Sequence, residues 1–277
     1  MKRYTKVLFI AAIVLLVGIF LYSGISLLVY YLESRESQQV YNDLANLVEQ
    51  ARPDPKPGVS EGPDDPETPI SSYVTVLDPR TGEPVELLSE YAQVYQRNPD
   101  LVGWISIEDT AINYPVVQSA LNKVDYYLYR DFNGKSDSHG CIYVREQCDV
   151  FAPSDNLTIY GHRMKDHTMF GHLAKYEKKD FWQTHQHIRF DTLKERHTYQ
   201  IVAVFTTTAT LGQGFSYHLF VDADSEAEFN SFLASCKRLS LYDTGITASY
   251  GDKLITLSTC EYTQENGRLV VVAKRID

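Results

Sequence analysis

The amino-acid sequence predicts one transmembrane helix followed by a mostly-β globular domain, either a barrel or a sandwich. Residues 7–32 form an apolar run without a charged side chain, which is typical of a membrane span. Eight segments between residues 101 and 276 are rich in β-branched and aromatic residues and are separated by Gly, Asn and Asp turns, which is typical of strands. The chain has 277 residues, enough for one such domain with its own core.

The run at residues 7–32 is long enough to cross about 30 Å of hydrocarbon as one helix. It is longer than the apolar region of a cleaved signal peptide, about 7–15 residues, and no small-x-small site follows it, so we expect it to remain as an anchor. Residues 1–6 carry three basic side chains, and the positive-inside rule therefore places them in the cytoplasm. Everything from residue 33 onward is expected outside the cell.

Residues 33–69 are expected to connect the span to the globular domain. Apolar residues recur at helical spacing in the first part of this segment, at Val40, Leu44, Leu47 and Val48. The helix is therefore expected to continue as a stalk. The stretch ARPDPKPGVSEGPDDPETP is rich in Pro, Asp and Glu and has almost nothing to bury, which predicts a flexible or extended linker over residues 51–69. The globular domain is predicted over residues 70–277.

The composition argues against nucleic acid and metal as partners. The formal net charge is -10, and the basic N-terminus lies inside the cell, so no nucleic-acid partner is expected. The four cysteines are too irregularly spaced for a small disulfide scaffold or a CxxC metal site. His162, His167 and His172 recur every five residues, which matches neither one helix face nor one strand face. We therefore expect no metal and no other cofactor.

The globular domain is expected to begin with an amphipathic helix from Glu86 to Arg97, which ends because a proline follows Asn98. The eight strands are predicted at LVGWISI, INYPVVQ, GCIYV, LTIYGH, HIRFDT, HTYQIVAVFTTT, KLITLSTC and RLVVVAKRI. Two helical segments interrupt them, around residues 169–182 and at residues 224–240. The second lies between the sixth and seventh strands.

The four cysteines have different expected environments. Cys236 falls in the predicted helix at 224–240 and is expected to be buried there. Cys141 and Cys148 could either pair as a disulfide outside the cell or remain as two thiols. Cys260 has no obvious partner, and an unpaired thiol outside the cell suggests a catalytic role.

Three reactive side chains are expected at strand ends. His162 ends LTIYGH, Cys260 ends KLITLSTC, and Arg268 begins the next strand, so Cys260 and Arg268 share one end of a hairpin. A nucleophilic cysteine needs a nearby histidine for proton transfer, and acyl transfer needs a donor where the oxyanion develops. Taken singly, a strand-end cysteine is more often structural and a strand-start arginine more often solvated. Together the three predict a candidate site for acyl transfer.

Five strings together resemble the sortases, and specifically class B: TLSTCE, YGHRM followed by HTMF, NPDLVGWI, INYPVVQ and GRLVVVAKRI. The resemblance covers the chain from about residue 86 to its end. It implies a closed β-barrel of about eight strands, with a helix before the barrel and a helix between the sixth and seventh strands. It also implies a cysteine transpeptidase of the Gram-positive cell surface.

The resemblance implies a role for each of the three reactive residues. Cys260 matches the nucleophile that attacks the Thr carbonyl of a C-terminal sorting signal and forms a thioacyl enzyme. His162 matches the general acid that protonates the leaving amine and then accepts a proton from the incoming one. Arg268 matches the residue that binds the substrate backbone and stabilises the oxyanion, and lysine would not reproduce its planar fork.

Further positions match residues of the family's substrate groove: Ser258, Glu261, Thr208, Asn122 and Leu128. Ser258 and Glu261 flank the nucleophile, Thr208 ends the FTTT strand, and the other two lie in the segment before RDF. The segment GQGFSYHLF is expected to form part of the groove wall.

The leading hypothesis is a single-pass membrane enzyme whose extracellular domain joins a surface protein to an amine, either a cell-wall peptide cross-bridge or a pilin lysine. Its expected partners are the sorting-signal peptide, that amine and the lipid bilayer. A second hypothesis is a cysteine protease whose acyl intermediate goes only to water. A third is a non-catalytic surface adhesin that keeps the barrel, and the co-occurrence of Cys260, His162 and Arg268 argues against it.

Overall fold

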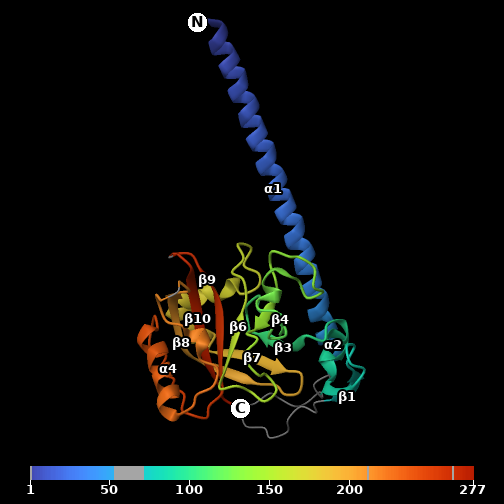
Figure 1. Ribbon diagram of the computed structural model, residues 1–277, viewed down its shortest axis with the longest axis vertical. Coiled ribbons are helices and arrows are strands. Elements are labelled where there is room, and N and C mark those ends of the chain that lie inside the picture. The colour runs from blue at the N-terminus through green and yellow to red at the C-terminus, as the bar shows by residue number, and fades with distance from the viewer. Residues whose placement is uncertain (1, 53–71, 211, 264) are drawn as a thin grey trace. The chain divides into compact units, whose positions relative to one another are not determined.

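The computed structural model describes residues 2–52, 72–210, 212–263 and 265–277 (Figure 1). From residue 53 onward, the predicted linker at 51–69 lies outside the described residues. The chain divides into two compact units, Met1–Val40 and Tyr41–Asp277.

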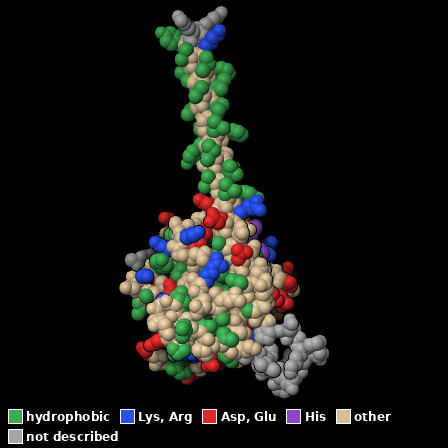
Figure 2. All heavy atoms as spheres, turned by 90° about the vertical axis from the view of Figure 1, so that its right-hand side faces the viewer, with side chains coloured by type: hydrophobic (Ala, Val, Ile, Leu, Met, Phe, Trp, Pro, Cys, Tyr) green, Lys and Arg blue, Asp and Glu red, His purple; other side chains and the backbone are tan. Residues whose placement is uncertain are grey.

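The helix α1 extends from Lys2 to Ala51 and contains the apolar run. An 18-residue stretch of it has a mean hydropathy of 2.7, and none of that stretch is buried. Figure 2 shows hydrophobic side chains along the visible face of this helix. By length and composition α1 could cross a membrane, as predicted, and it continues past residue 32, as predicted for the stalk.

The last turns of α1 belong to the second compact unit. Tyr41, Leu44 and Val48 are buried there, with 4%, 0% and 3% of their surface exposed. Their spacing of three and four residues places them on one face of the helix. The second compact unit begins at Tyr41, and apolar side chains of the predicted stalk are buried in it. The boundary of the catalytic domain at residue 70 stays a prediction.

The predicted helix over Glu86–Arg97 is wrong in its first part. The segment contains the end of the strand β2 (Pro84–Leu88), the 3-10 helix η1 (Ser89–Tyr91) and the helix α2 (Ala92–Arg97), and the strand β1 (Tyr73–Leu77) precedes it. Leu87 and Leu88 are both buried, and β2 pairs with β1, which the helical spacing did not indicate. The helix ends before Asn98, as predicted.

The eight predicted strands of the domain are present and form a closed barrel in the order β10-β8-β7-β3-β4-β5-β6-β9. Their bounds are β3 Leu101–Ser106, β4 Asn113–Val117, β5 Ile142–Val144, β6 Asn156–Tyr160, β7 His187–Thr192, β8 Thr198–Thr208, β9 Leu254–Glu261 and β10 Gly267–Arg275. The pairs β4–β5 and β6–β9 are parallel. The barrel, and not the sandwich, is therefore the correct alternative.

Short helices occupy the connections between strands: η2 (Tyr126–Tyr129), η3 (Gly171–Glu177), α3 (Lys179–Thr184), η4 (Tyr217–Leu219) and α4 (Glu226–Leu239). The helix α4 lies between the sixth and seventh barrel strands, as predicted, and packs beside β8 (Figure 1). The side chain of Ser225 accepts a hydrogen bond from the backbone N–H of Glu228 and caps its N-terminus. Phe229, Phe232 and Cys236 lie on its buried face.

Three of the cysteines are buried thiols. Cys236 is fully buried in α4, as predicted. Cys141 and Cys148 are free, so the alternative of a disulfide between them is wrong. Their sulfur atoms contact different groups: the Cys141 Sγ lies 3.3 Å from the Tyr41 hydroxyl, and the Cys148 Sγ donates to the Asn156 carbonyl at 3.5 Å. Burial raises the pKa of both thiols, which keeps them protonated.

Candidate active site

The hairpin of β9 and β10 brings Cys260 and Arg268 together. The two residues are direct partners in the antiparallel ladder, and Ser258 pairs with Val270 two positions further along. Direct partners in such a ladder have their side chains on the same face, as do residues two apart on one strand. Cys260, Ser258 and Arg268 therefore share one face of the barrel wall. Cys260 is partly exposed, unlike the other three cysteines.

The chain that continues from β6 places His162 on the other side of Cys260. β6 and β9 are parallel, and Tyr160 pairs with Ser258. The pairing continues beyond the strand: the Gly161 N–H donates to the Ser258 carbonyl at 3.2 Å, and the Thr259 hydroxyl donates to the Gly161 carbonyl at 2.8 Å. The next step in this register places His162 level with Cys260. The nucleophile candidate thus lies between a histidine from β6 and an arginine from β10.

Gly161 allows the chain to pass from Tyr160 to His162 in a confined space. A Cβ atom at this position would collide with the Ile142 side chain and the Phe170 ring. The residue before His162 must therefore be glycine for the backbone to stay in register beside β9.

The His162 imidazole has a defined tautomer and a lowered pKa. Its Nε2 lies 2.7 Å from the Leu128 carbonyl oxygen, and because that oxygen can only accept, Nε2 carries the hydrogen. Burial lowers the pKa of His162 from its ordinary value of 6.5, and the nearby positive charge of Arg268 lowers it further. The neutral ring therefore leaves Nδ1 free of hydrogen and able to accept a proton.

The positive charge of Arg268 is available to a ligand. Its guanidinium donates to the Gly267 carbonyl at 2.9 Å and to the Asn266 carbonyl at 3.3 Å, both in its own turn. Within the described residues no ion pair links it to a carboxylate. A half-exposed guanidinium without an acidic partner can bind a carbonyl oxygen or an oxyanion of a ligand.

Ser258 and Glu261, the predicted groove residues on either side of Cys260, have different environments, and their contact with substrate stays a prediction. The Ser258 hydroxyl is buried and lies 2.6 Å from the Tyr217 hydroxyl, which covers it on the face that it shares with Cys260. Glu261 accepts hydrogen bonds from the Thr263 N–H at 2.8 Å and from the Thr263 hydroxyl at 2.7 Å. Burial alone would raise the pKa of Glu261, but these hydrogen bonds outweigh it and leave the pKa below its ordinary value. Glu261 is therefore an anion that fixes the turn after Cys260.

The three remaining groove candidates are placed differently. Leu128 lies in η2, and its carbonyl contacts His162 directly. The ladder partner of Thr208 is Gly267, and the ladder partner of Arg268 is Thr207. Thr207, and not Thr208, therefore lies directly beside Arg268. The Thr208 hydroxyl donates to the Glu265 carbonyl at 3.0 Å. Asn122 is exposed in a turn before η2. Substrate contact by these three residues stays a prediction.

Two residues of the site were not identified from the sequence. Tyr217 lies in the segment GQGFSYHLF, expected as groove wall, but it is 4% exposed and its hydroxyl contacts the buried Ser258 hydroxyl. His139 is 1% exposed, and its charge acts on His162. The burial of Tyr217 could have been expected from its aromatic neighbours, whereas the sequence around His139 contains no signal of its position.

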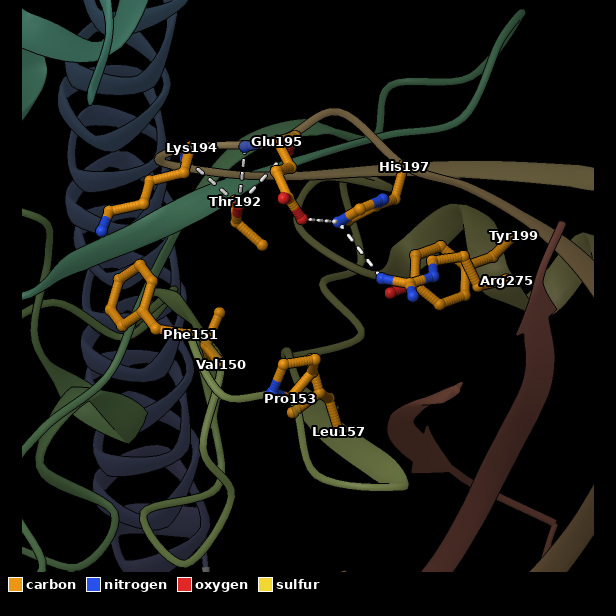
Figure 3. Close-up of a pocket in the computed structure, with 10 residues that line it drawn as sticks. All are labelled: Val150, Phe151, Pro153, Leu157, Thr192, Lys194, Glu195, His197, Tyr199 and Arg275. Atoms are coloured by element: carbon orange, nitrogen blue, oxygen red, sulfur yellow. Dashed lines mark hydrogen bonds and ion pairs between the residues drawn. The ribbon is translucent and has the colours of Figure 1, made fainter. Parts of the chain in front are cut away.

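A separate pocket lies at the other end of the barrel strands (Figure 3). It is lined by Val150, Phe151, Pro153, Leu157, Thr192, Lys194, Glu195, His197, Tyr199 and Arg275. Tyr199 and Arg275 pair at one end of the β8–β10 ladder, and Thr207 and Arg268 pair at the opposite end. Since none of the three reactive side chains is among the described residues that line it, this pocket is not the candidate active site.

Comparison with known proteins identifies the family. A family model described as the sortase domain matches residues 105–276. Sortase B of Listeria monocytogenes is 33% identical over 193 residues, which is 69% of this chain and 76% of that protein. A crystal structure of sortase B from Bacillus anthracis aligns with a TM-score of 0.67 and 31% identity, and covers 89% of this chain and 99% of that chain. A Staphylococcus aureus sortase B–substrate complex aligns with a TM-score of 0.69 and 25% identity over the same shares.

These matches agree with the barrel and with the helix between its sixth and seventh strands. The family model covers more than half of the chain. Sortases are membrane-associated surface enzymes, and the chain has one N-terminal helix that could span a membrane. The chain belongs to the sortase family, and it is a class B sortase, a cysteine transpeptidase.

Proposed function

We propose that this enzyme cleaves the C-terminal sorting signal of surface proteins after a Thr residue and transfers the protein to an amine. The observation that carries the proposal is the position of Cys260 between Arg268, its ladder partner, and His162, at the same level of β6. The amine is the cross-bridge of a cell-wall peptide or a pilin lysine. The Staphylococcus aureus relative has been solved with a substrate, which supports a peptide as the first partner.

Acylation uses all three side chains. The Cys260 sulfur attacks the Thr carbonyl carbon, and its proton passes to Nδ1 of His162, the ring nitrogen left open by the bond from Nε2 to Leu128. The carbonyl oxygen becomes an oxyanion, which the Arg268 guanidinium stabilises. His162 then gives its proton to the leaving amine nitrogen, and the C–N bond breaks. The product is a thioester between Cys260 and the Thr carbonyl.

Deacylation reverses these roles. The incoming amine attacks the thioester carbon while His162 accepts one of the amine's protons. Arg268 again stabilises the oxyanion. When the C–S bond breaks, His162 returns the proton to the Cys260 sulfur, and the neutral thiol and neutral imidazole are restored. Water in place of the amine would give a hydrolysed product by the same steps.

We also propose that α1 anchors the enzyme with residues 1–6 in the cytoplasm and the catalytic domain outside. The apolar run and the basic residues before it support this topology. Protease added to intact protoplasts is expected to digest the chain beyond about residue 33. Protection of the domain would overturn the orientation.

The transfer is tested with the full chain in detergent and a library of fluorogenic sorting peptides, with and without a peptide amine or a lysine-containing peptide. We expect a mass shift of Cys260 by the acyl group in the absence of amine, and a product joined to the amine in its presence. Release of acid alone at saturating amine would favour the cysteine protease instead. Cleavage by a Cys260→Ala variant would overturn the site.

A further inference from the structure

A buried histidine outside the three reactive residues is held between two carboxylates. The His139 ring is 1% exposed, and its Nδ1 lies 3.0 Å from Asp137 Oδ1. Its Nε2 lies 3.4 Å from Asp166 Oδ2. Asp166 is fixed in turn, because its Oδ1 accepts from the Thr168 N–H at 3.1 Å and from the Thr168 hydroxyl at 2.6 Å. A ring with a carboxylate at each nitrogen is suited to carry the second proton, since both nitrogens then donate.

The two carboxylates belong to different segments. Asp137 precedes His139 in a turn, whereas Asp166 lies four residues after His162 in the loop that follows β6. The ion pair between His139 and Asp166 therefore joins the loop of the proposed general acid to the turn at residues 137–140. We call this contact the loop bridge.

The turn at residues 137–140 is itself attached to η2. The Asp137 N–H donates to the Tyr129 carbonyl at 3.1 Å, and the Cys141 N–H donates to the Tyr127 carbonyl at 3.0 Å. The residue between these two carbonyls is Leu128, whose own carbonyl accepts the His162 hydrogen bond. His162 is thus held from two directions, directly by η2 and through the loop bridge to the turn that is bonded to η2.

We propose that His139 is a positioning residue for His162: as an imidazolium it holds the loop of residues 162–166 against the η2 segment, so that the His162 ring keeps its bond to Leu128 and presents Nδ1 to the nucleophile. This inference rests on the proposed role of His162. It assigns to His139 no contact with the substrate.

The charge state supports the geometry. Burial lowers the pKa of His139, but the hydrogen bonds and charges of Asp137 and Asp166 raise it by more, so that the net pKa is above its ordinary value of 6.5. The positive charge also acts on His162, whose pKa it helps to lower. Tyr41 contacts the same turn through the Gly140 carbonyl, and burial holds the pKa of that phenol well above its usual range. Among these titratable groups of the turn, His139 is therefore the one that carries the positive charge.

The test compares variants of the full chain in detergent, with a thiol titration of Cys260 to count active enzyme. Asp166→Asn keeps the side-chain shape and removes the charge of the loop bridge, and His139→Gln removes the cation. Both are expected to lower kcat by about 10-fold or more, with KM within about 2-fold, because the acid is misplaced after the peptide has bound. His187→Gln, at the exposed start of β7, is the matched control and should leave both constants unchanged.

A double variant tests the bridge itself. In His139→Gln with Asp166→Asn, the Gln amide can donate to the Asn oxygen, so a neutral bridge replaces the charged one and kcat is expected to recover above that of Asp166→Asn alone. Histidine NMR gives a readout that is independent of turnover. The wild-type chain should show a single His162 tautomer, with the hydrogen on Nε2, and Asp166→Asn should lose this single-tautomer signal. An unchanged tautomer with unchanged kcat per active site would overturn the inference. Absence of turnover by the wild-type chain, with the tautomer change still seen, would instead contradict the proposed function alone.

Discussion

Cys260 and Arg268 are direct partners in the β9–β10 ladder. Main-chain hydrogen bonds of two adjacent barrel strands therefore fix their separation. A site on paired strands holds its groups more accurately than a site on loops. Only His162 reaches the site from a position beyond a strand end, which is why its loop needs further contacts to hold the ring.

The nucleophile is tested by Cys260→Ala. Both cleavage and transfer should be lost, because no other partly exposed thiol is present among the four cysteines. The melting temperature should stay within about 2 °C, since a small side chain at a strand end is replaced by a smaller one. Peptide cleavage assays and a melting curve of one preparation check both expectations, and a variant with substantial cleavage would refute the assignment.

Arg268→Lys tests whether the guanidinium geometry matters beyond its charge. Lysine keeps a positive charge but loses the parallel donors, so kcat/KM should fall about 100-fold or more, in the range seen when one oxyanion donor is removed. Stability should hardly change, because the hydrogen bonds that the Arg268 side chain makes to described residues all go to carbonyls of its own turn. Steady-state kinetics with a fluorogenic sorting peptide measure the loss. Near wild-type kinetics would exclude Arg268 from the mechanism.

The lowered pKa of His162 predicts the acid side of the pH profile. The neutral ring accepts the thiol proton, so kcat/KM should fall as pH decreases through the His162 pKa, which lies below 6.5. At pH 6.5, on the acid side of the profile, kcat/KM should therefore still be more than half of its maximum value. The pH dependence of kcat/KM and an NMR titration of the ring should give the same midpoint. A midpoint above 6.5 in either measurement contradicts the predicted direction.

Gly140→Ala should disturb the Leu128 carbonyl that holds His162. Gly140 has a φ of +58°, and a Cβ there would collide with the Leu128 and Tyr127 carbonyl groups. Gly82→Ala is the matched control, because its φ of +73° is equally unfavourable for alanine but the space around it is open. The control should lose about 1 kcal/mol of unfolding free energy, and Gly140→Ala about 2 kcal/mol more, together with activity. Equal losses in the two variants would show that no collision occurs.

Leu44→Ala tests whether the end of α1 is part of the catalytic unit. Leu44 is fully buried, and removing its side chain should cost about 2–5 kcal/mol of unfolding free energy. Asn46→Ala, two residues further along and on the exposed side of the helix, is the control and should cost less than about 0.5 kcal/mol. Denaturant unfolding of the full chain in detergent checks the pair. A Leu44→Ala variant as stable as the control would support residue 70 as the boundary.

The strands of the barrel could be predicted because each is a short run of β-branched and aromatic residues between turn residues. The start of the domain could not. Leu87 and Leu88 fit a helical face as well as a strand, and only the pairing with β1 decides for β2. The run YVTVL of β1 has the composition of a strand but is not among the predicted strands. Likewise the burial of Leu44 depends on tertiary packing, which helical periodicity alone does not reveal.

The same difference applies to the site. Cys260 and Arg268 could be placed together from the sequence because they flank one hairpin, and adjacent strands usually pair. The place of His162 depended on the resemblance to sortases, since the parallel pairing of β6 with β9 joins segments far apart in the chain. His139 could not be predicted, because its two carboxylate neighbours meet it only after the loops have packed.

The pairing of β6 with β9 also determines when the enzyme becomes reactive. Thr259 and Gly161, which hold the two strands together beyond the ladder, are 98 positions apart. Contacts of such long range form late in folding, because the entropy of closing the intervening loop must be overcome first. In the proposed topology the chain crosses the membrane from its N-terminal end, so the His162 imidazole emerges before the Cys260 thiol, and the two meet only when the barrel closes. In the proposed mechanism, acylation of Cys260 therefore begins only with the completed barrel.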